Sequence, residues 1–274
     1  MSFQGGKMPV TLAILTRNSG TTLERALESA RDFDDIIVCD GGSTDDTLEI
    51  ARKFGARIIA QDMHYLDADG RIFDYASVRN QTLQAAKHDW FFFLDSDEWC
   101  GPHLVDAMRN IVRERSERGQ GAFWINRKYV MTGEVIDCAA TYPNRQMRFF
   151  SRHSVEQFIK KVHERIKVRD GITPEILDGV LFIPFDPDVA AIRRKWDYQI
   201  AVAAAQISPL SVWNFLDAAL HCAKVSALWF ARLFYQRIFC RGTRMPFKFE
   251  MERHYFHLRL LRAFWREVRF SKHS

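Results

Sequence analysis

The chain has 274 residues, of which 47% are hydrophobic and 27% are charged; these values fit one large globular domain, or a domain with an appendage. The net charge of +5 is uneven, because residues 190–274 contain 15 Lys/Arg and 5 Asp/Glu, which leaves 24 and 29 in residues 1–189. The five cysteines have no CxxC spacing, which argues against a disulfide framework or zinc site, so we expect free thiols in a reducing cytosol.

Strands and helices alternate over the first 118 residues. We expect strands at 10–15, 36–39, 56–60 and 90–94, and helices at 21–33, 44–54, 77–87 and 102–118. The strand after Pro9 is too short for a signal peptide. This order predicts an α/β fold with a mostly parallel, Rossmann-like sheet flanked by helices.

After residue 121 the pattern changes to short strands at 122–131, 145–150, 163–168 and 179–185, which predict an antiparallel extension of the same domain. From residue 189 the chain is expected to be helical. The one long uncharged stretch, 198–216, contains several polar residues, which argues against a membrane span. We therefore predict a domain at 8–188 and a helical, basic and aromatic C-terminal extension at 189–274.

The stretch FFFLDSDEW runs an apolar strand directly into Asp95, Asp97 and Glu98. Two carboxylates two residues apart at a strand end can share Mg²⁺ or Mn²⁺, with substrate phosphate oxygens as further ligands. The alternative is a strand-end turn with solvated acids. The buried strand before the D-x-D favours the metal site.

Polar clusters also follow the first two strands. They are Thr16, Arg17 and Asn18 in TRN, and Asp40, Gly41 and Ser43 in VCDGGSTDDT. Ligands of parallel sheets bind beyond the carboxyl ends of the strands, so we expect one site where these clusters meet the acidic one. Each cluster alone is also ordinary turn and helix-cap chemistry.

Two further segments offer candidate residues. Arg79, in an early helix, could counter a diphosphate, although an exposed helix arginine is more common. In VHERI, His163 could be a metal ligand and Glu164 a general base. Adjacent strand residues point to opposite faces, so both face one site only where the strand ends or bulges. The alternative is a surface His–Glu pair.

In their order and spacing, the segments ILTRN, VCDGGSTDDT, RN, FLDSDE, RQMRFF and VHE resemble the inverting glycosyltransferases of family 2, which have the GT-A fold. They cover about 60% of the chain. The QMRFF and VHE segments are most similar to bacterial enzymes that glycosylate the lipopolysaccharide inner core.

The resemblance implies a nucleotide-sugar donor, most simply a UDP-sugar. The clusters with Thr16 and Asp40 would hold the nucleoside, Arg79 would lie near the diphosphate, and Asp95 and Asp97 would hold the ribose and the metal. The metal would neutralise the departing nucleoside diphosphate.

Inversion also needs a base that deprotonates the acceptor hydroxyl. Many family members use an Asp in a later E-D or D-D pair, and no clear E-D pair occurs here. Glu164 is therefore the predicted base, with Glu98 and Asp137 as alternatives. Arg148, in RQMRFF, is expected to contact the donor or the acceptor.

The C-terminal extension interleaves aromatic residues with arginines, as in HYFHLRLLRAFWREVRF. This pattern fits an interfacial helix on an anionic membrane. A helix packed on the catalytic domain, or a homodimer contact, is the alternative, and nothing else in the sequence supports nucleic acid as a partner.

The predicted function is transfer of a sugar to a glycolipid acceptor by a cytoplasmic enzyme, peripheral on the inner face of the cytoplasmic membrane. Three alternatives stay open: a protein glycosyltransferase, a nucleotidyltransferase and a non-catalytic membrane-associated scaffold.

Overall fold

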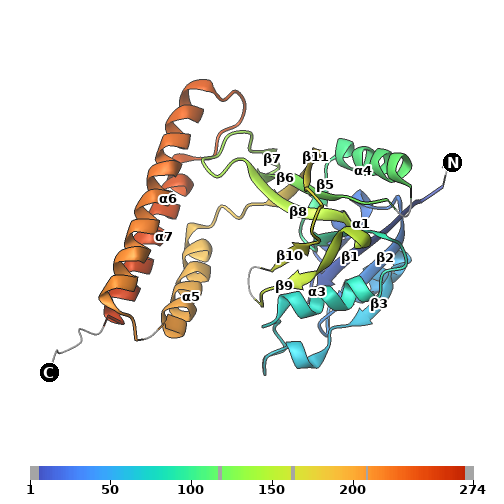
Figure 1. Cartoon of the computed structure of the whole chain (residues 1–274), viewed down its shortest axis with the longest axis horizontal. Coiled ribbons are helices and arrows are strands. Elements are labelled where there is room, and N and C mark those ends of the chain that lie inside the picture. Colours follow the sequence, from blue (N-terminus) through green and yellow to red (C-terminus); the bar gives the residue numbers. More distant parts are fainter. Residues whose placement is uncertain (1–5, 117–118, 162–163, 208, 269–274) are drawn as a thin grey trace. The chain divides into compact units, whose positions relative to one another are not determined.

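The computed structural model describes residues 6–116, 119–161, 164–207 and 209–268. The chain forms two compact units (Figure 1). The N-terminal unit contains Met1–Lys128 and Pro143–Pro184, and the C-terminal unit contains Tyr129–Tyr142 and Phe185–Ser274. The expected boundary at 188 therefore lies close to the observed one. Residues 129–142 differ from the expectation, because they pack with the C-terminal unit.

The N-terminal unit is built on a mixed sheet with strand order β3-β2-β1-β4-β8-β6-β11-β5. The last residues of β6 pair with β7 within residues 129–142, which belong to the C-terminal unit. The strands are β1 Met8–Thr16, β2 Phe33–Asp40, β3 Arg57–Ala60, β4 Trp90–Asp95, β5 Trp99–Cys100, β6 Ala122–Met131, β7 Glu134–Val135, β8 Asn144–Ser151 and β11 Glu175–Pro184. The first four are mutually parallel, whereas β8 is antiparallel to both β4 and β6. The predicted α/β class and its antiparallel extension are confirmed.

Helices and a hairpin cover the two faces of this sheet. The elements are α1 Leu23–Ser29, α2 Thr47–Lys53, α3 Tyr75–Gln84, α4 Pro102–Arg115, the short helices η1 Met63–Tyr65 and η2 Arg152–Ser154, and the hairpin strands β9 Val155–Ile159 and β10 Arg165–Val168. Alternate residues of β4 divide between the faces, so Phe92 packs with α1 and α4, and Phe91 and Phe93 pack with α3 and β9. All three rings are buried, which explains why the strand is apolar throughout.

At the amino end of the sheet, a buried carboxylate ties three segments together. Asp35 on β2 forms two hydrogen bonds with the Arg57 guanidinium, at 2.8 and 2.9 Å, and accepts others from Thr11 Oγ1 at 2.8 Å and the Lys87 amide at 3.1 Å. Burial alone would raise the pKa of Asp35, but these partners lower it below its usual value.

The C-terminal unit contains three helices, α5 Val189–Ile207, α6 Val212–Phe239 and α7 Phe247–Arg266. Helix α7 packs on both α5 and α6 (Figure 1). A small core joins Ile136 and Ala139 of the excursion 129–142 to Met245 and Phe249. No helix among the described residues combines the length and apolar character that a membrane span requires.

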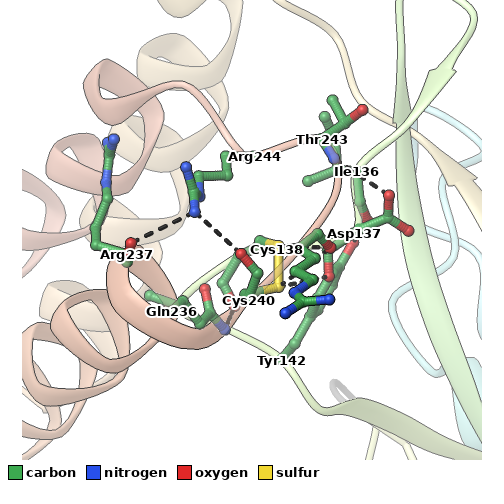
Figure 2. The surroundings of a disulfide bond; sticks show 12 residues. Ile136, Asp137, Cys138, Tyr142, Gln236, Arg237, Cys240, Thr243 and Arg244 are labelled. Carbon is green, nitrogen blue, oxygen red and sulfur yellow. Dashed lines mark hydrogen bonds between the residues drawn. A yellow bond between two sulfur atoms is a disulfide. The ribbon is translucent and has the colours of Figure 1, made fainter.

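A disulfide links Cys138 to Cys240 at the end of α6, 102 residues apart in sequence (Figure 2). The expectation of five free thiols was therefore wrong for this pair, and only the buried Cys39, Cys100 and Cys222 are free. Hydrogen bonds surround the bridge: Gln236 Nε2 donates to the Ala139 carbonyl at 2.6 Å. Covalent and polar links thus hold the excursion to the helices.

We expect Asp35→Asn to lower the free energy of unfolding by about 2 kcal/mol at pH 7, since Arg57 loses its anionic partner. A carboxylate with a lowered folded-state pKa contributes stability above its unfolded pKa of about 3.9 and loses it as pH falls through the folded value. The difference between wild type and variant in urea titrations should therefore shrink at acidic pH. A difference independent of pH would contradict this account.

We expect Cys240→Ser to lower the free energy of unfolding by roughly 2–4 kcal/mol, because the bridge closes a long loop. A reductant should destabilise the wild type by a similar amount and leave the double variant Cys138→Ser/Cys240→Ser unchanged. Non-reducing peptide mapping checks the pairing directly. Free thiols at both positions in protein purified without reductant would contradict it.

Candidate active site

Strand register brings the three polar clusters into one row. Thr16 at the end of β1 pairs with Asp40 at the end of β2, and Leu15 pairs with Asp95 at the end of β4. Because β1 lies between β2 and β4, all three carboxyl ends meet at one edge of the sheet. The sequence-based expectation of a common site is therefore consistent with the pairing.

The loop after β2 is organised around Asp40, which is 7% exposed. Its Oδ1 accepts from Thr16 Oγ1 at 2.8 Å and Ser43 Oγ at 2.5 Å, and its Oδ2 accepts from the amides of Gly42 and Ser43 at 2.9 and 2.8 Å. Gly42 has a φ of +81°, a conformation that favours glycine. Four hydrogen bonds make Asp40 the residue that holds the turn, so its predicted contact with a nucleoside stays a prediction.

The loop after β1 is tied to the same turn. The Asn18 amide donates to Ser43 Oγ and the Thr44 amide donates to Asn18 Oδ1, both at 2.8 Å. Arg17 points elsewhere, donating to the Asp69 carbonyl at 2.6 Å. A side chain at Gly41 would approach Gln61 Oε1 to 2.7 Å, so the backbone there passes close to a buried amide. The two loops thus form one rigid surface beside the strand ends.

Asp95 lies between two buried arginines. Arg79 Nη2 from α3 donates to its Oδ1 at 2.5 Å, and Arg148 Nη2 from β8 donates to its Oδ2 at 2.8 Å. The two guanidinium groups are also each 4.5 Å from the Phe93 ring centroid. Desolvation would raise the pKa of Asp95, but the charges of Arg148 and Arg79 hold it well below its usual range.

Several N–H groups of these arginines have no hydrogen-bond partner among the described residues. Arg79 Nε and Nη1 and Arg148 Nη1 are buried and lack a hydrogen-bond acceptor within the described part of the chain. The side chains of Arg79 and Arg148 are 3% and 1% exposed. Buried N–H groups without acceptors are costly, and a phosphate oxygen is an acceptor that guanidinium groups bind well.

Glu98 extends the ion cluster inward. It is 3% exposed and lies 3.2 Å from Arg148 Nη2 and 3.3 Å from Arg127 Nη1. Burial raises the pKa of Glu98, although the charge of Arg148 opposes the shift. This buried carboxylate balances the positive charge of the arginines. It is less accessible to an acceptor hydroxyl than a general base must be.

Glu164, the residue before β10, lies at the same ion cluster. Its Oε1 lies 3.6 Å from Arg79 Nε, and its side chain is 16% exposed. The hairpin that carries it is anchored to α3: Asn80 Nδ2 donates to the Phe158 carbonyl at 2.9 Å, and the Phe158 amide donates to Asn80 Oδ1 at 2.8 Å. Arg79 therefore contacts the ion cluster, and Asn80 holds the hairpin to α3.

The donor set fits a divalent metal only in part. Each oxygen of Asp95 accepts a hydrogen bond from an arginine, which leaves fewer lone pairs for a metal, so the role of Asp95 as a metal ligand stays a prediction. Asp97 is exposed. No group of three His, Cys, Asp or Glu side chains able to hold a metal occurs among the described residues, and His163 lies outside them. One carboxylate with substrate phosphates is still a common Mg²⁺ arrangement.

The structure adds residues that the sequence did not indicate. Tyr75 lies beside Glu164, and burial together with that charge raises its pKa. Gln146 Oε1 accepts from Arg148 Nε at 2.9 Å. Since residues 146 and 148 share one face of β8, the strand period could have indicated Gln146.

Asp137, an alternative candidate for the general base, belongs to the C-terminal unit. There the Thr243 amide donates to its carboxylate at 3.2 Å (Figure 2).

Comparison with known proteins identifies the front of the chain. Residues 11–125 match the family model described as glycosyl transferase family 2. This part of the chain is therefore similar to the family 2 glycosyltransferases. The similarity supports the expected family over the region that carries Asp40, Arg79, Asp95 and Asp97. Arg148 and Glu164 lie beyond the matched residues.

Individual relatives match over part of their length. A TPR repeat-containing protein of Synechococcus elongatus is 31% identical over 60% of this chain and 37% of its own. The glucosyltransferase WfaP of Escherichia coli, named as acting with UDP-Glc on α-D-GlcNAc-diphosphoundecaprenol to form a β-1,3 linkage, is 32% identical over 41% of this chain and 43% of its own. The chain thus spans less than half the length of either relative.

Among solved structures, Staphylococcus aureus TarS, residues 1–349 in complex with UDP, is 16% identical. The match has a TM-score of 0.46 and covers 73% of this chain and 65% of that one.

We expect Asp95→Asn to lower the free energy of unfolding by about 1–3 kcal/mol, since two buried guanidinium groups lose their shared anion. Asp97→Asn, the matched change two residues away on an exposed side chain, should shift it by less than about 1 kcal/mol. Urea denaturation of both variants measures the difference. Equal losses would show that the two arginines do not depend on Asp95.

Proposed function

We propose that this chain is an inverting glycosyltransferase that moves a sugar from a UDP-sugar to a lipid-linked acceptor. The observation that carries the proposal is the pair of buried arginines at Asp95, with unpartnered N–H groups at the edge of the sheet where Thr16 and Asp40 also lie. A pair of buried guanidinium groups beside hydrogen-bonded polar loops suits a nucleoside diphosphate.

The donor would lie across this edge. The loops of Asn18 and Ser43 would contact the nucleoside, and Arg79 and Arg148 would donate to the diphosphate. Asp95 would position both guanidinium groups, so that they are already oriented when the donor arrives. The UDP-Glc in the name of the E. coli relative supports uridine as the base.

A divalent cation would be held by Asp97 together with the donor's phosphate oxygens. Bound there, it would supply charge neutralisation for the leaving diphosphate. The exposure of Asp97 and the arginine pairing of Asp95 support this division of roles within the D-x-D.

In the transfer itself, an acceptor hydroxyl oxygen attacks the anomeric carbon from the face opposite the leaving group. The new carbon–oxygen bond forms as the bond from the anomeric carbon to the β-phosphate oxygen breaks, and UDP leaves with the electron pair. Glu164 takes the hydroxyl proton. Arg79 and Arg148 stabilise the charge that develops on the departing phosphate oxygens.

The acceptor is proposed to be a lipid-linked sugar, as in bacterial envelope or lipopolysaccharide core synthesis. The diphosphoundecaprenol in the name of the E. coli relative supports the class. Helices α6 and α7 support it independently, because they expose large apolar side chains among basic ones. Exposed fractions are 79% for Trp213, 70% for Phe234, 63% for Phe239 and 51% for Trp265.

These helices would rest on the inner face of the cytoplasmic membrane, with rings at the acyl boundary and arginines on headgroups. A disulfide is uncommon in the cytosol, so the Cys138–Cys240 bridge is the observation that weighs against this location.

We expect UDP to bind in the presence of Mn²⁺ and Asp97→Ala to weaken that binding at least tenfold, because the variant removes the carboxylate proposed to hold the cation. Isothermal titration of the purified chain with UDP, with and without Mn²⁺, measures the effect.

The matched control is Asp34→Ala, an exposed carboxylate at the amino end of β2 that pairs with His88, which should bind UDP as the wild type does. If UDP fails to bind while another nucleoside diphosphate binds, the donor assignment is wrong and the enzyme class stands. If no nucleotide binds, the proposed function itself is wrong.

A further inference from the structure

A second cationic pocket lies in the C-terminal unit, between α5 and α7. Its volume is about 360 Å³, and its lining consists of Arg193, Tyr255, Leu258, Arg259 and Arg262. The four residues from α7 recur at intervals of three and four, so they share one face of that helix. The pocket contains none of the residues that the proposed transfer uses.

Carboxylates only partly neutralise its arginines. Arg193 forms a two-pronged ion pair with Glu252, which is 5% exposed, and Arg259 Nη1 donates to Asp197 Oδ1 at 2.8 Å. Arg262 has no hydrogen bond or ion pair with the described residues. Three guanidinium groups therefore face two carboxylates, which leaves the pocket with a positive charge.

Arg259 also retains unused donors. Its Nε and Nη2 are buried and have no hydrogen-bond partner within the described residues. Buried N–H groups of a cation are costly to leave unpaired, and a tetrahedral phosphoryl group presents several oxygens that guanidinium groups bind in pairs. The charge and the spare donors point to the same chemical class of ligand.

The apolar residues of the lining indicate what carries the phosphoryl group. Tyr255 is 48% and Leu258 is 63% exposed, on the same helix face as the arginines. A free phosphate would leave these surfaces in water. An amphiphile would cover them with its hydrocarbon chain while its headgroup meets the arginines.

We propose that this pocket binds the phosphoryl headgroup of a membrane lipid, with Arg259 and Arg262 as donors and Leu258 and Tyr255 against the chain. The inference deepens the proposed function, since a lipid-linked acceptor requires the enzyme to work at a membrane. The pocket makes the attachment selective for phosphomonoester headgroups, beyond what diffuse basic charge provides.

The test is co-sedimentation of the full chain with phosphatidylcholine vesicles, with and without phosphatidic acid. Arg262→Gln should weaken binding to the phosphatidic acid vesicles more than about tenfold, because it removes a guanidinium contact with the phosphoryl group as well as the roughly fivefold contribution of one basic side chain at an anionic surface. Arg266→Gln is the matched control, because it removes the same charge from the exposed end of α7 outside the pocket, and it should weaken binding by no more than about fivefold.

Leu258→Ala should also weaken vesicle binding, and because Leu258 is exposed the change leaves the fold intact. Equal losses for Arg262→Gln and Arg266→Gln would overturn the pocket in favour of diffuse charge. Displacement from vesicles by inorganic phosphate at the concentration of the lipid phosphate would overturn the lipid assignment. Asp97→Ala separates the two proposals, since it should lose UDP binding and keep vesicle binding.

Discussion

The N-terminal unit depends at its functional edge on one carboxylate shared by two buried arginines. Asp95 comes from β4, Arg79 from α3 and Arg148 from β8, so the ion pairs join the parallel half of the sheet, its antiparallel half and a covering helix. Guanidinium groups removed from water need an anion nearby, and Asp95 provides it for both. The position of Asp95 therefore determines where the two guanidinium groups lie at this edge of the sheet.

The same interaction separates the roles of the two acids in D-x-D. Asp95 continues the strand and turns toward the arginines, whereas Asp97 lies beyond the strand end and is exposed. One acid therefore pairs with the cationic groups, and the other has an exposed side chain. The third acid, Glu164, belongs to the hairpin of β9 and β10. Two hydrogen bonds between Asn80 and Phe158 hold this hairpin to α3, and Glu164 lies 3.6 Å from Arg79 Nε.

Much of this could be predicted from the sequence, because local patterns carry it. The apolar run at 90–94 and the alternation with helices predicted a buried parallel strand, and β4 Trp90–Asp95 confirms it. The strand ends then located Thr16, Asp40 and Asp95 at one edge. What the pattern could not show were the partners of Asp95, because Arg79 and Arg148 are 16 and 53 residues away and reach it only through the fold. Residue type alone therefore suggested a metal ligand.

The excursion 129–142 was mispredicted for a similar reason. In the sequence, residues 122–131 have the pattern of one strand, and β6 Ala122–Met131 confirms it. The last residues of β6 nevertheless belong to the C-terminal unit. There Ile136 and Ala139 pack against Met245 and Phe249. Two cysteines 102 residues apart carry no spacing signal, so their pairing is visible only once this packing is known.

The contacts around the disulfide also bear on where the protein works. The Ala140 amide donates to the buried Glu250 carboxylate at 2.8 Å, Gln236 Nε2 donates to the Ala139 carbonyl, and the small apolar core lies beside them. Burial raises the pKa of Glu250, whereas the hydrogen bond from the Ala140 amide lowers it, so desolvation of the carboxylate opposes this contact. These interactions join the excursion to α6 and α7 in addition to the bridge. The bridge therefore adds stability to an arrangement that other forces specify, and a reducing cytosol would weaken the C-terminal unit without removing the packing that defines it.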